Sequence, residues 1–409
     1  MLSQPRMQFA LVLLESLRMI HYVGSYGVIG HMTDALGIGI SSMQAYLMLP
    51  FITGCMVGQS SVGLLSDRIG RRRTTMIFLG IYVLSCLATA FCHSPWLFMI
   101  LRACAGLGST VGEISVRTII HENCDVKSGA KHYSRISGYS YILVGLAPLL
   151  LNQVSNLFGW QSFFIINGMI GITIFVITRT QLYRLAKSVQ RKTATWQQLI
   201  DQLKRTIQNV QYRSSCFKYA LVVTVLESGF FLFPVILTDH FGLSKTWLSI
   251  LYGVITGIVG YLSGQMNTFL LKHFRITDVT SAMVIICCVL SFGYVATFGL
   301  ISGLAQFSCY LMIFYLSFLC SNIMIINLFV STTQSIEKDA VGSGLITSLT
   351  VSVYALASLI AGYLVTHLIT DDPFEIALGF AVYMAVVLVV YFFIDYRRTT
   401  STAAVKTNI

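Results

Sequence analysis

The sequence predicts an all-α membrane protein of twelve transmembrane helices in two six-helix halves. Hydrophobic residues make up 55% of the 409 residues and charged residues only 11%, with a mean hydropathy of +0.75. This composition excludes an ordinary soluble globular protein. The apolar residues form runs close to the roughly 20 residues that cross a bilayer as a helix. Lys and Arg concentrate between alternate runs, and one long polar stretch divides the runs six and six.

Twelve apolar runs are long enough to be spans. The first carries Glu15, Arg18 and His21, but no small-residue cleavage site follows it, so we expect it to remain in the mature protein as a span. The predicted spans lie near residues 8–30, 42–65, 74–92, 95–119, 135–155, 161–179, 217–238, 246–271, 279–300, 303–331, 341–368 and 374–394.

The positions of the basic residues give an independent test of this topology. With the amino terminus inside, 23 of the 27 Lys and Arg residues fall in segments that face the cytoplasm, as the positive-inside rule requires. Lys245 falls in an outer loop, and Arg18, Arg102 and Arg117 lie within spans. We therefore expect both termini in the cytoplasm. The net charge of +11 reflects topology and gives no reason to expect a nucleic-acid partner.

The longest polar stretch, roughly residues 180 to 216, separates the two predicted halves. Within it, Trp196, Leu199, Leu203, Ile207 and Val210 recur at helical spacing, which predicts an amphipathic helix on the inner membrane surface. A plain linker and a regulatory or partner-docking role both fit this pattern. The expected units are an N-terminal half over 1–180, a cytoplasmic linker over 181–216, a C-terminal half over 217–396 and a cytoplasmic tail over 397–409.

A short internal sequence similarity relates the first predicted span to the seventh. Leu13–Ser16 reads LLES and Val225–Ser228 reads VLES, about half a chain apart. Spans one and seven would then correspond, as in transporters built from parallel repeats with a midplane site. This similarity also aligns Glu15 with Glu227.

Seven ionisable residues within spans are the candidates for proton coupling and substrate binding. A charge near the bilayer centre costs about 2.5 to 3.5 kcal/mol on insertion scales, so such a residue should face a cavity or a partner. In span four, residues 102, 113 and 117 share one helical stripe, and residues 113 and 117 are close enough to pair. Residues 15 and 18 have the spacing of an intrahelical ion pair. The candidates are Glu15, Arg18, His21, Arg102, Glu113, Arg117 and Glu227.

Some of these residues have the character of proton carriers. A carboxylic acid in a partly dry cavity holds a proton near neutrality and releases it when water or a cation arrives. Glu15 and Glu227 have this character, and His21 is a further titratable group. The alternative for the ion pairs is structural pairing inside the bundle, and for His21 it is hydrogen-bonded packing.

The segment Gly63–Arg73 reads GLLSDRIGRRR between two apolar runs. It combines a glycine that permits close helix approach, an acidic residue that can cap a helix, a second glycine for the reversal and arginines at a membrane face. It resembles the G-x-x-x-D-R-x-G-R-R loop of the major facilitator superfamily. The resemblance implies a conformational latch in alternating access, built from Gly63, Asp67, Arg68, Gly70, Arg71 and Arg72.

Residues 10 to 180 resemble more narrowly the Bcr/CflA-like and MdfA-like multidrug:proton antiporters. The segment 101–120, LRACAGLGSTVGEISVRTII, is similar to their fourth helix, and this resemblance implies that Arg102 handles protons. The context LVLLE implies that Glu15 recognises cationic drugs and takes part in coupling. Gly145 and Pro148 match the fifth-helix motif of these antiporters.

The chain also departs from the antiporter pattern. In span five, Leu151 and Asn152 replace a glycine pair, and Ala105 replaces a glutamine after the span-four arginine. Arg18 adds a cation to span one, which disfavours lipophilic cations unless Glu15 neutralises it. An anionic or zwitterionic substrate, such as a carboxylate siderophore, is therefore a second possibility beside drugs.

The sequence thus predicts a proton-coupled exporter of small amphiphilic molecules, monomeric and embedded in the lipid of a bacterial inner membrane. A proton symporter that imports a nutrient and a transport-inactive receptor or scaffold are the alternatives. Six aromatic residues of the second half could line a substrate cavity: Phe230, Phe231, Tyr252, Tyr310, Phe314 and Tyr354. We expect no enzyme activity and no cofactor, because the sequence contains no metal-ligand cluster, no phosphate loop and no nucleophile with a base at useful spacing. We expect no metal site, because the ten cysteines are scattered and form no C-x-x-C motif.

Overall fold

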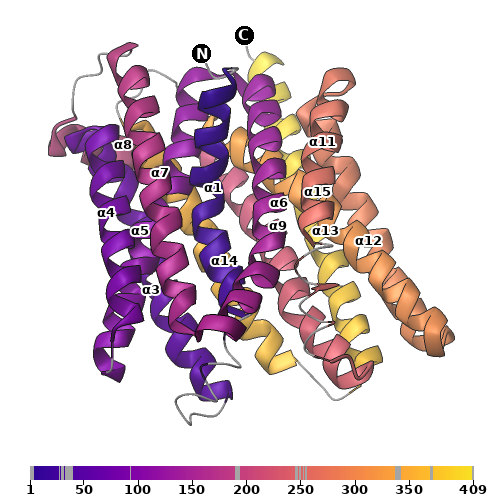
Figure 1. The fold of residues 1–409 in the computed structure, drawn as a ribbon. Coiled ribbons are helices and arrows are strands. Elements are labelled where there is room, and N and C mark those ends of the chain that lie inside the picture. Colours follow the sequence, from indigo (N-terminus) through magenta and orange to yellow (C-terminus); the bar gives the residue numbers. More distant parts are fainter. Residues whose placement is uncertain are drawn as a thin grey trace.

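The computed structural model describes residues 4–26, 28, 32, 40–92, 94–188, 194–244, 247, 250–251, 253, 256–336, 342–368 and 372–407. Helices make up almost all of this part of the chain and run side by side as a bundle (Figure 1). The two termini lie at the same end of that bundle.

A helix stands at each of the twelve predicted spans. The N-terminal half contains α1 (Pro5–Tyr26), α3 (Ile40–Ile69), α4 (Arg71–Ala90), α5 (Pro95–Asn123), α6 (Val126–Phe158) and α7 (Gln161–Ser188). The shorter helix α8 (Trp196–Gln208) leads to the C-terminal half. That half contains α9 (Val210–Val235), the π-helical turn η1 (Ile236–His240), α11 (Thr256–His273), α12 (Ile276–Leu300), α13 (Gly303–Thr333), α14 (Ser343–Leu368) and α15 (Pro373–Thr407).

Local sequence signals explain several helix ends. Gly70 separates α3 from α4 with a positive φ of 93°, a conformation that glycine adopts without strain. Pro95 occupies the first turn of α5, where its missing N–H costs no hydrogen bond. Thr195 and Gln198 form a reciprocal capping box at the start of α8.

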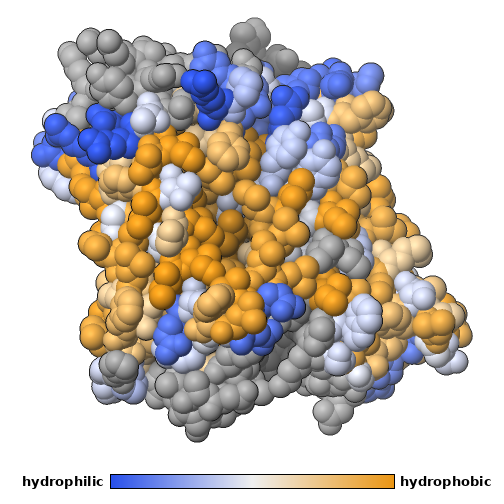
Figure 2. Space-filling model, viewed as in Figure 1, coloured by the Kyte–Doolittle hydropathy of each residue, from blue (hydrophilic) through white to orange (hydrophobic). Residues whose placement is uncertain are grey.

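The surface of the bundle matches a bilayer. Within the described residues, eight helices are long and apolar enough to cross a membrane by length and composition, with windows of mean hydropathy from 1.4 to 2.5. Figure 2 shows a broad hydrophobic band across the face of the bundle in view, with hydrophilic residues gathered toward its two ends. The predicted all-α membrane fold is therefore confirmed.

The two halves meet along two helix pairs, α6 with α11 and α3 with α14. Glycines make the first of these crossings close: a Cβ on Gly145 would lie 2.7 Å from the Gly253 carbonyl oxygen and 2.8 Å from the Gly257 Cα. Pro148 lies on the same face, next to Gly253. The span-five motif residues thus stand where the halves touch.

A second close crossing lies inside the N-terminal half, between α1 and α5. A Cβ added to Gly112 would lie only 2.0 Å from the carbonyl oxygen of Leu14. Such contact is possible only for glycine, and it brings the charged stretches of α1 and α5 within reach of each other.

Two helices extend beyond the predicted spans. Helix α6 begins at Val126, because the polar residues 126–135 form its first turns ahead of the apolar run. Helix α15 continues to Thr407, whereas its apolar part, Pro373–Ile394, coincides with the predicted span 374–394. Parts of the first, eighth and eleventh predicted spans, together with Lys245, Lys338 and Tyr252, lie outside the described residues.

The α1–α5 crossing gives a direct test of the packing. We expect Gly112→Ala to destabilise the protein by about 1–3 kcal/mol, because the new methyl group overlaps the Leu14 backbone. Gly80→Ala in α4 is the matched control, since a Cβ there would meet nothing within 4 Å. Thermal unfolding in detergent measures the difference, and a Gly112→Ala protein as stable as the Gly80→Ala protein would contradict the described crossing.

Candidate functional site

A cavity of about 60 Å³ lies in the bundle interior between the two halves. Its charged lining comes from the N-terminal half, with Glu15 and Arg18 on α1 and Glu113 and Arg117 on α5. The C-terminal half contributes mainly Leu226, Asn322, Ile325, Ile326 and Tyr354. The volume holds a few water molecules, so a larger molecule enters only if the helices around it separate.

Glu113 is shared by two arginines. The Arg18 Nε donates to Glu113 Oε2 at 2.8 Å, and Arg117 forms an ion pair with the same carboxylate. The predicted pairing of residues 113 and 117 is present. The predicted intrahelical pair of Glu15 with Arg18 was wrong, because the close approach of α1 to α5 at Gly112 brings Glu113 within reach of Arg18.

Glu15 is held mainly by a tyrosine. The Tyr133 hydroxyl donates to Glu15 Oε1 at 3.0 Å, whereas the nearest charged group, Arg117 Nη2, is 4.0 Å away. The other carboxylate oxygen, Oε2, is buried and has no hydrogen-bond partner in the structure. Sequence reasoning missed Tyr133, because a tyrosine outside the predicted span carries no charge signal.

Arg117 lies against two adjoining aromatic rings, whose centres are 5.8 Å apart. Its guanidinium carbon is 5.3 Å from the ring centre of Tyr133 and 4.7 Å from that of Phe329, within the range of cation–π attraction. The Nε and Nη1 groups are buried without hydrogen-bond acceptors. An arginine with unmet donors beside a cavity is suited to binding an anion.

Glu227 lies across the cavity region on α9 and is partly exposed. It accepts a hydrogen bond from the hydroxyl of Tyr354 on α14, which itself lines the cavity. Beside it, the Tyr141 hydroxyl of α6 donates to Asn322 Oδ1 of α13 at 2.6 Å, a contact between the two halves. The structure thus brings five of the seven candidate residues to one region.

The other two candidates, His21 and Arg102, form a separate and fully buried cluster. The Tyr82 hydroxyl donates to Asn167 Oδ1 at 3.3 Å, so His21 Nδ1, which is 3.0 Å from that hydroxyl, must be the donor to it. His21 Nε2 is then left to accept from Arg102 Nη1. This assignment makes His21 a neutral imidazole.

Arg102 has a carbonyl and an imidazole as partners. Its Nε donates to the Leu47 carbonyl at 2.9 Å, its guanidinium lies 4.9 Å from the Phe51 ring centre, and Nη2 is unpartnered. Among the described residues no carboxylate pairs with it. Although Arg102 shares a helical stripe with residues 113 and 117, it does not line the cavity.

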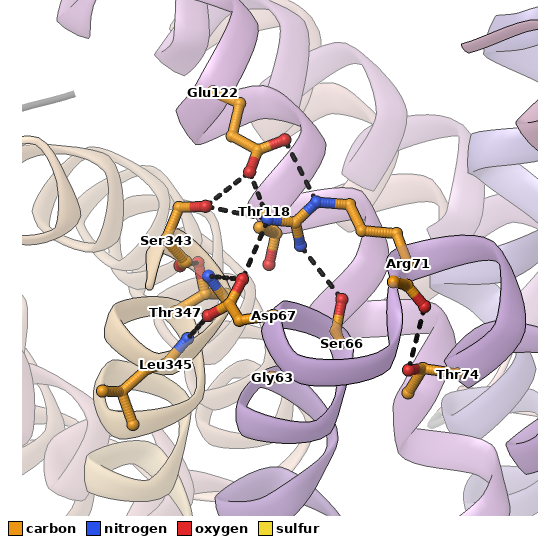
Figure 3. A network of polar contacts seen from close by, with 12 residues as sticks. Gly63, Ser66, Asp67, Arg71, Thr74, Thr118, Glu122, Ser343, Leu345 and Thr347 are labelled. Atoms are coloured by element: carbon orange, nitrogen blue, oxygen red, sulfur yellow. Dashed lines mark hydrogen bonds and ion pairs between the residues drawn. The ribbon is translucent and has the colours of Figure 1, made fainter. Parts of the chain in front are cut away.

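The predicted latch motif joins the two halves at the end of the bundle that carries the termini, which we call the latch end. The Asp67 carboxylate accepts the backbone N–H groups of Gly344 at 3.1 Å and Leu345 at 2.8 Å, in the first turn of α14 (Figure 3). A carboxylate is favoured at a helix N-terminus by the exposed amides and the helix dipole. Gly63 approaches Gly344 closely, and its own N–H donates to Ser348 Oγ at 2.9 Å.

Arg71 links the contact between Asp67 and α14 to helix α5. Its Nη2 donates to Asp67 Oδ1 at 3.2 Å and to Ser343 Oγ at 2.8 Å, and its guanidinium also binds both carboxylate oxygens of Glu122 (Figure 3). Ser343 in turn donates to Glu122. Sequence reasoning missed Glu122, because the predicted fourth span ended at residue 119 and left it in a loop.

Arg68 contacts α8 rather than the opposite half. Its Nη1 donates to the Ala194 carbonyl at 3.4 Å, and its guanidinium carbon lies 5.7 Å from the Trp196 ring centre. Leu199 of α8 is buried against Leu345 of α14. Helix α8 therefore covers the junction of α3 and α14. Gly70 supplies the turn described above, and Arg72 lies in the first turn of α4.

Two of the aromatic candidates of the C-terminal half line cavities. Tyr354 lines the cavity described above, and Phe314 lines a smaller one of about 30 Å³ within the C-terminal half. Tyr310 belongs to an apolar cluster with Phe314 and Phe233. The side chains of Phe230 and Phe231 lie outside what the structure describes.

In the described part of the chain, no three metal-ligating side chains gather.

The contact of Asp67 with the start of α14 predicts how the latch end responds when that contact is weakened. Asp67→Asn should open the latch end, because the amide keeps one acceptor but loses the charge that holds Arg71 and the α14 N-terminus. We expect longer and broader distances between spin labels at the exposed residues 127 and 272, measured by electron–electron double resonance after replacement of accessible cysteines. Asp278→Asn, an exposed change on α12, should leave the distances unaltered. Unaltered distances in Asp67→Asn would count against the latch.

Comparison with known proteins places the chain in a family. The family model described as Major Facilitator Superfamily matches residues 11–358. The chain is 23% identical over 244 residues to "Multidrug resistance protein MdtL" of Shewanella sp. (strain ANA-3), a match that covers 58% of this chain and 59% of the relative. The chain thus matches about three-fifths of that relative's length.

Solved structures show the same fold. A bacterial homologue of the iron transporter ferroportin, in an outward-facing state with soaked iron, superposes with a TM-score of 0.73 at 14% identity, covering 95% of this chain and 99% of the other. A structure of the E. coli fucose:proton symporter FucP gives 0.66 at 14% identity, covering 95% and 98%. The predicted family resemblance is confirmed: the chain is a multi-pass membrane protein that belongs to the major facilitator superfamily, a family of small-molecule transporters.

Proposed function

We propose that this protein is a proton-coupled exporter of small amphiphilic molecules that works by alternating access. The proposal rests on the contacts that surround the carboxylates of Glu15 and Glu227. Glu15 lines the central cavity, and Glu227 binds Tyr354, which also lines it. Each carboxylate accepts a hydrogen bond from a tyrosine hydroxyl, and within the described residues neither has an ion pair closer than 4.0 Å. Such carboxylates are suited to exchanging a proton for a substrate.

The arrangement of the halves supports the alternating-access part of the proposal. The halves contact each other at the latch end through Asp67, Arg71 and the start of α14. The cavity, at about 60 Å³, is too small for a drug-sized molecule. Transport therefore requires the halves to rock apart around the cavity, at one end and then at the other.

Charge placement supports the orientation that we propose. The latch end carries the arginine-rich segment 68–73 and the basic helix α8, so by the positive-inside rule it faces the cytoplasm with both termini. We place the protein in a bacterial inner membrane as a monomer, and we take 1–180 and 217–396 as its halves, with the linker 181–216 and the tail 397–409. The MdtL relative named above is bacterial.

Within this proposal, His21 and Arg102 form a second proton-handling group. Arg102 is a fully buried cation whose hydrogen bonds within the described chain go to a carbonyl and to neutral His21. Because a proton on His21 would place two cations in contact, protonation of His21 requires Arg102 to move away. This coupling links proton entry to movement of α5.

Proton-coupled import of a nutrient is the second candidate function. It is favoured by the uncompensated cation at the cavity, which suits polar anionic nutrients as well as drugs. The direction of transport separates the two functions: an exporter lowers the cellular content of its substrate, and an importer raises it.

The export proposal predicts a substrate-dependent collapse of a pH gradient. In everted vesicles with an acidic interior, lipophilic cations, zwitterions and carboxylate metabolites are added in turn while a pH-sensitive dye reports the gradient. We expect at least one compound to collapse it in the wild type. Glu15→Gln should abolish the collapse because it removes a proton carrier, whereas the exposed change Glu375→Gln should not.

Two outcomes would count against this proposal. If no compound of any charge collapses the gradient in the wild type, proton exchange is not the mechanism. If Glu15→Gln collapses it as fast as Glu375→Gln does, Glu15 is not the proton carrier.

A further inference from the structure

We propose that the transported molecule is a zwitterion, whose anionic group binds Arg18 and Arg117 and whose basic group takes the place of the proton on Glu15 or Glu227. This inference rests on the proposed proton exchange and specifies the chemistry of the substrate at the same site. It follows from the charges and the unmet hydrogen bonds around the cavity.

The first argument is a count of charges. Arg18 and Arg117 share the single carboxylate of Glu113, so this group of three carries a net charge of +1. Glu15 and Glu227 each add either no charge or one negative charge. The site therefore carries +1 when both are protonated and −1 when both have lost their protons.

The second argument concerns the arginines. Arg117 leaves Nε and Nη1 without acceptors, and the Arg18 side chain is 13% exposed, with its ion pair made through Nε. Unmet buried donors cost free energy, and a planar carboxylate is the acceptor that fits a guanidinium best. A purely cationic substrate would leave these donors unmet and would lie against the charge of Arg18.

The third argument concerns the carboxylates. Glu15 Oε2 is buried without a donor, and Glu227 accepts one hydrogen bond from Tyr354. When one of the two carboxylates has given up its proton, the site carries no net charge, so a net-neutral substrate keeps it neutral, whereas a simple anion or a simple cation leaves an uncompensated charge. A basic group on the substrate supplies the donor that the deprotonated carboxylate lacks, so a zwitterion satisfies both sets of residues.

The rest of the lining combines apolar and polar side chains. Leu226, Ile325 and Ile326 line the cavity on the side of the C-terminal half, and Tyr133 borders it next to Arg117. Ser137, Ser140 and Asn322 add hydrogen-bonding groups. This lining suits an amphiphilic body between the two charged groups.

A matched set of three probes tests the substrate charge. Norfloxacin carries a carboxylate and a basic amine, its ethyl ester keeps only the amine, and its N-acetyl derivative keeps only the carboxylate. Purified protein is reconstituted in liposomes that contain a pH-sensitive dye, and proton release is recorded with each probe. We expect the zwitterion to drive proton exchange about tenfold or more faster than either derivative, since each derivative loses a charge-assisted contact.

Two substitutions of one residue sharpen the test. Arg18→Gln makes the group around Glu113 neutral, so we expect it to lose the preference for norfloxacin and to exchange protons for the cationic ester. Arg18→Lys keeps the charge and should keep the preference for the zwitterion. Size-exclusion chromatography checks that both variants are folded. If either variant does not fold, the comparison of the three probes on the wild-type protein still tests the proposal.

The outcomes distinguish this inference from the proposed function. Equal or faster exchange with the ester or the N-acetyl derivative in the wild type would overturn the zwitterion proposal while supporting proton exchange. Wild-type protein that exchanges protons with none of the three probes, yet does so with lipophilic cations, would overturn it as well. Failure with every compound would instead overturn the proposed function.

Discussion

The centre of the bundle depends on one carboxylate, Glu113, that is shared by two arginines from different directions. Breaking such a buried pair leaves an uncompensated charge, which costs several kcal/mol. The pairing exists because Gly112 brings the backbones of α1 and α5 together, so that Arg18 reaches Glu113 at 2.8 Å. It engages both arginines and leaves Glu15 with a tyrosine as its main partner, the arrangement on which the proposed proton exchange rests.

Helix α5 connects this centre with the latch end. Glu113 and Glu122 lie nine residues apart on it, which corresponds to about 13 Å along a helix. The first belongs to the cavity and the second holds Arg71 beneath the start of α14. In the mechanism that we propose, a change of charge in the cavity moves α5 and thereby alters the contact between the halves. Helix α8 packs over the same contact, so it would be displaced in that movement.

The sequence predicted the twelve helices well, because hydropathy and the placement of Lys and Arg are properties of segments. The latch motif was equally accessible, since its glycines and Asp67 occur at fixed spacing. The ion pairs inside the cavity could not be predicted in this way. Whether Arg18 pairs with Glu15 or with Glu113 depends on the distance between α1 and α5, and the spacing of residues along one helix does not determine that distance. Tyr133 and Glu122 were missed for the same reason, since nothing in the sequence marks them before the fold brings them to their partners. Tyr354 was named as a cavity-lining residue, but its hydrogen bond to Glu227 was not predicted.

In the mechanism that we propose, Glu15 and Glu227 carry exchangeable protons while Glu113 stays ionised. Infrared difference spectroscopy of the purified protein, recorded between mildly acidic and alkaline buffer, measures protonated carboxyl groups directly. We predict a carboxylic-acid band that decreases in Glu15→Gln and again in Glu227→Gln, and that Glu113→Asp leaves in place. A band absent from the wild type, or one unchanged by both glutamine substitutions, would contradict the account.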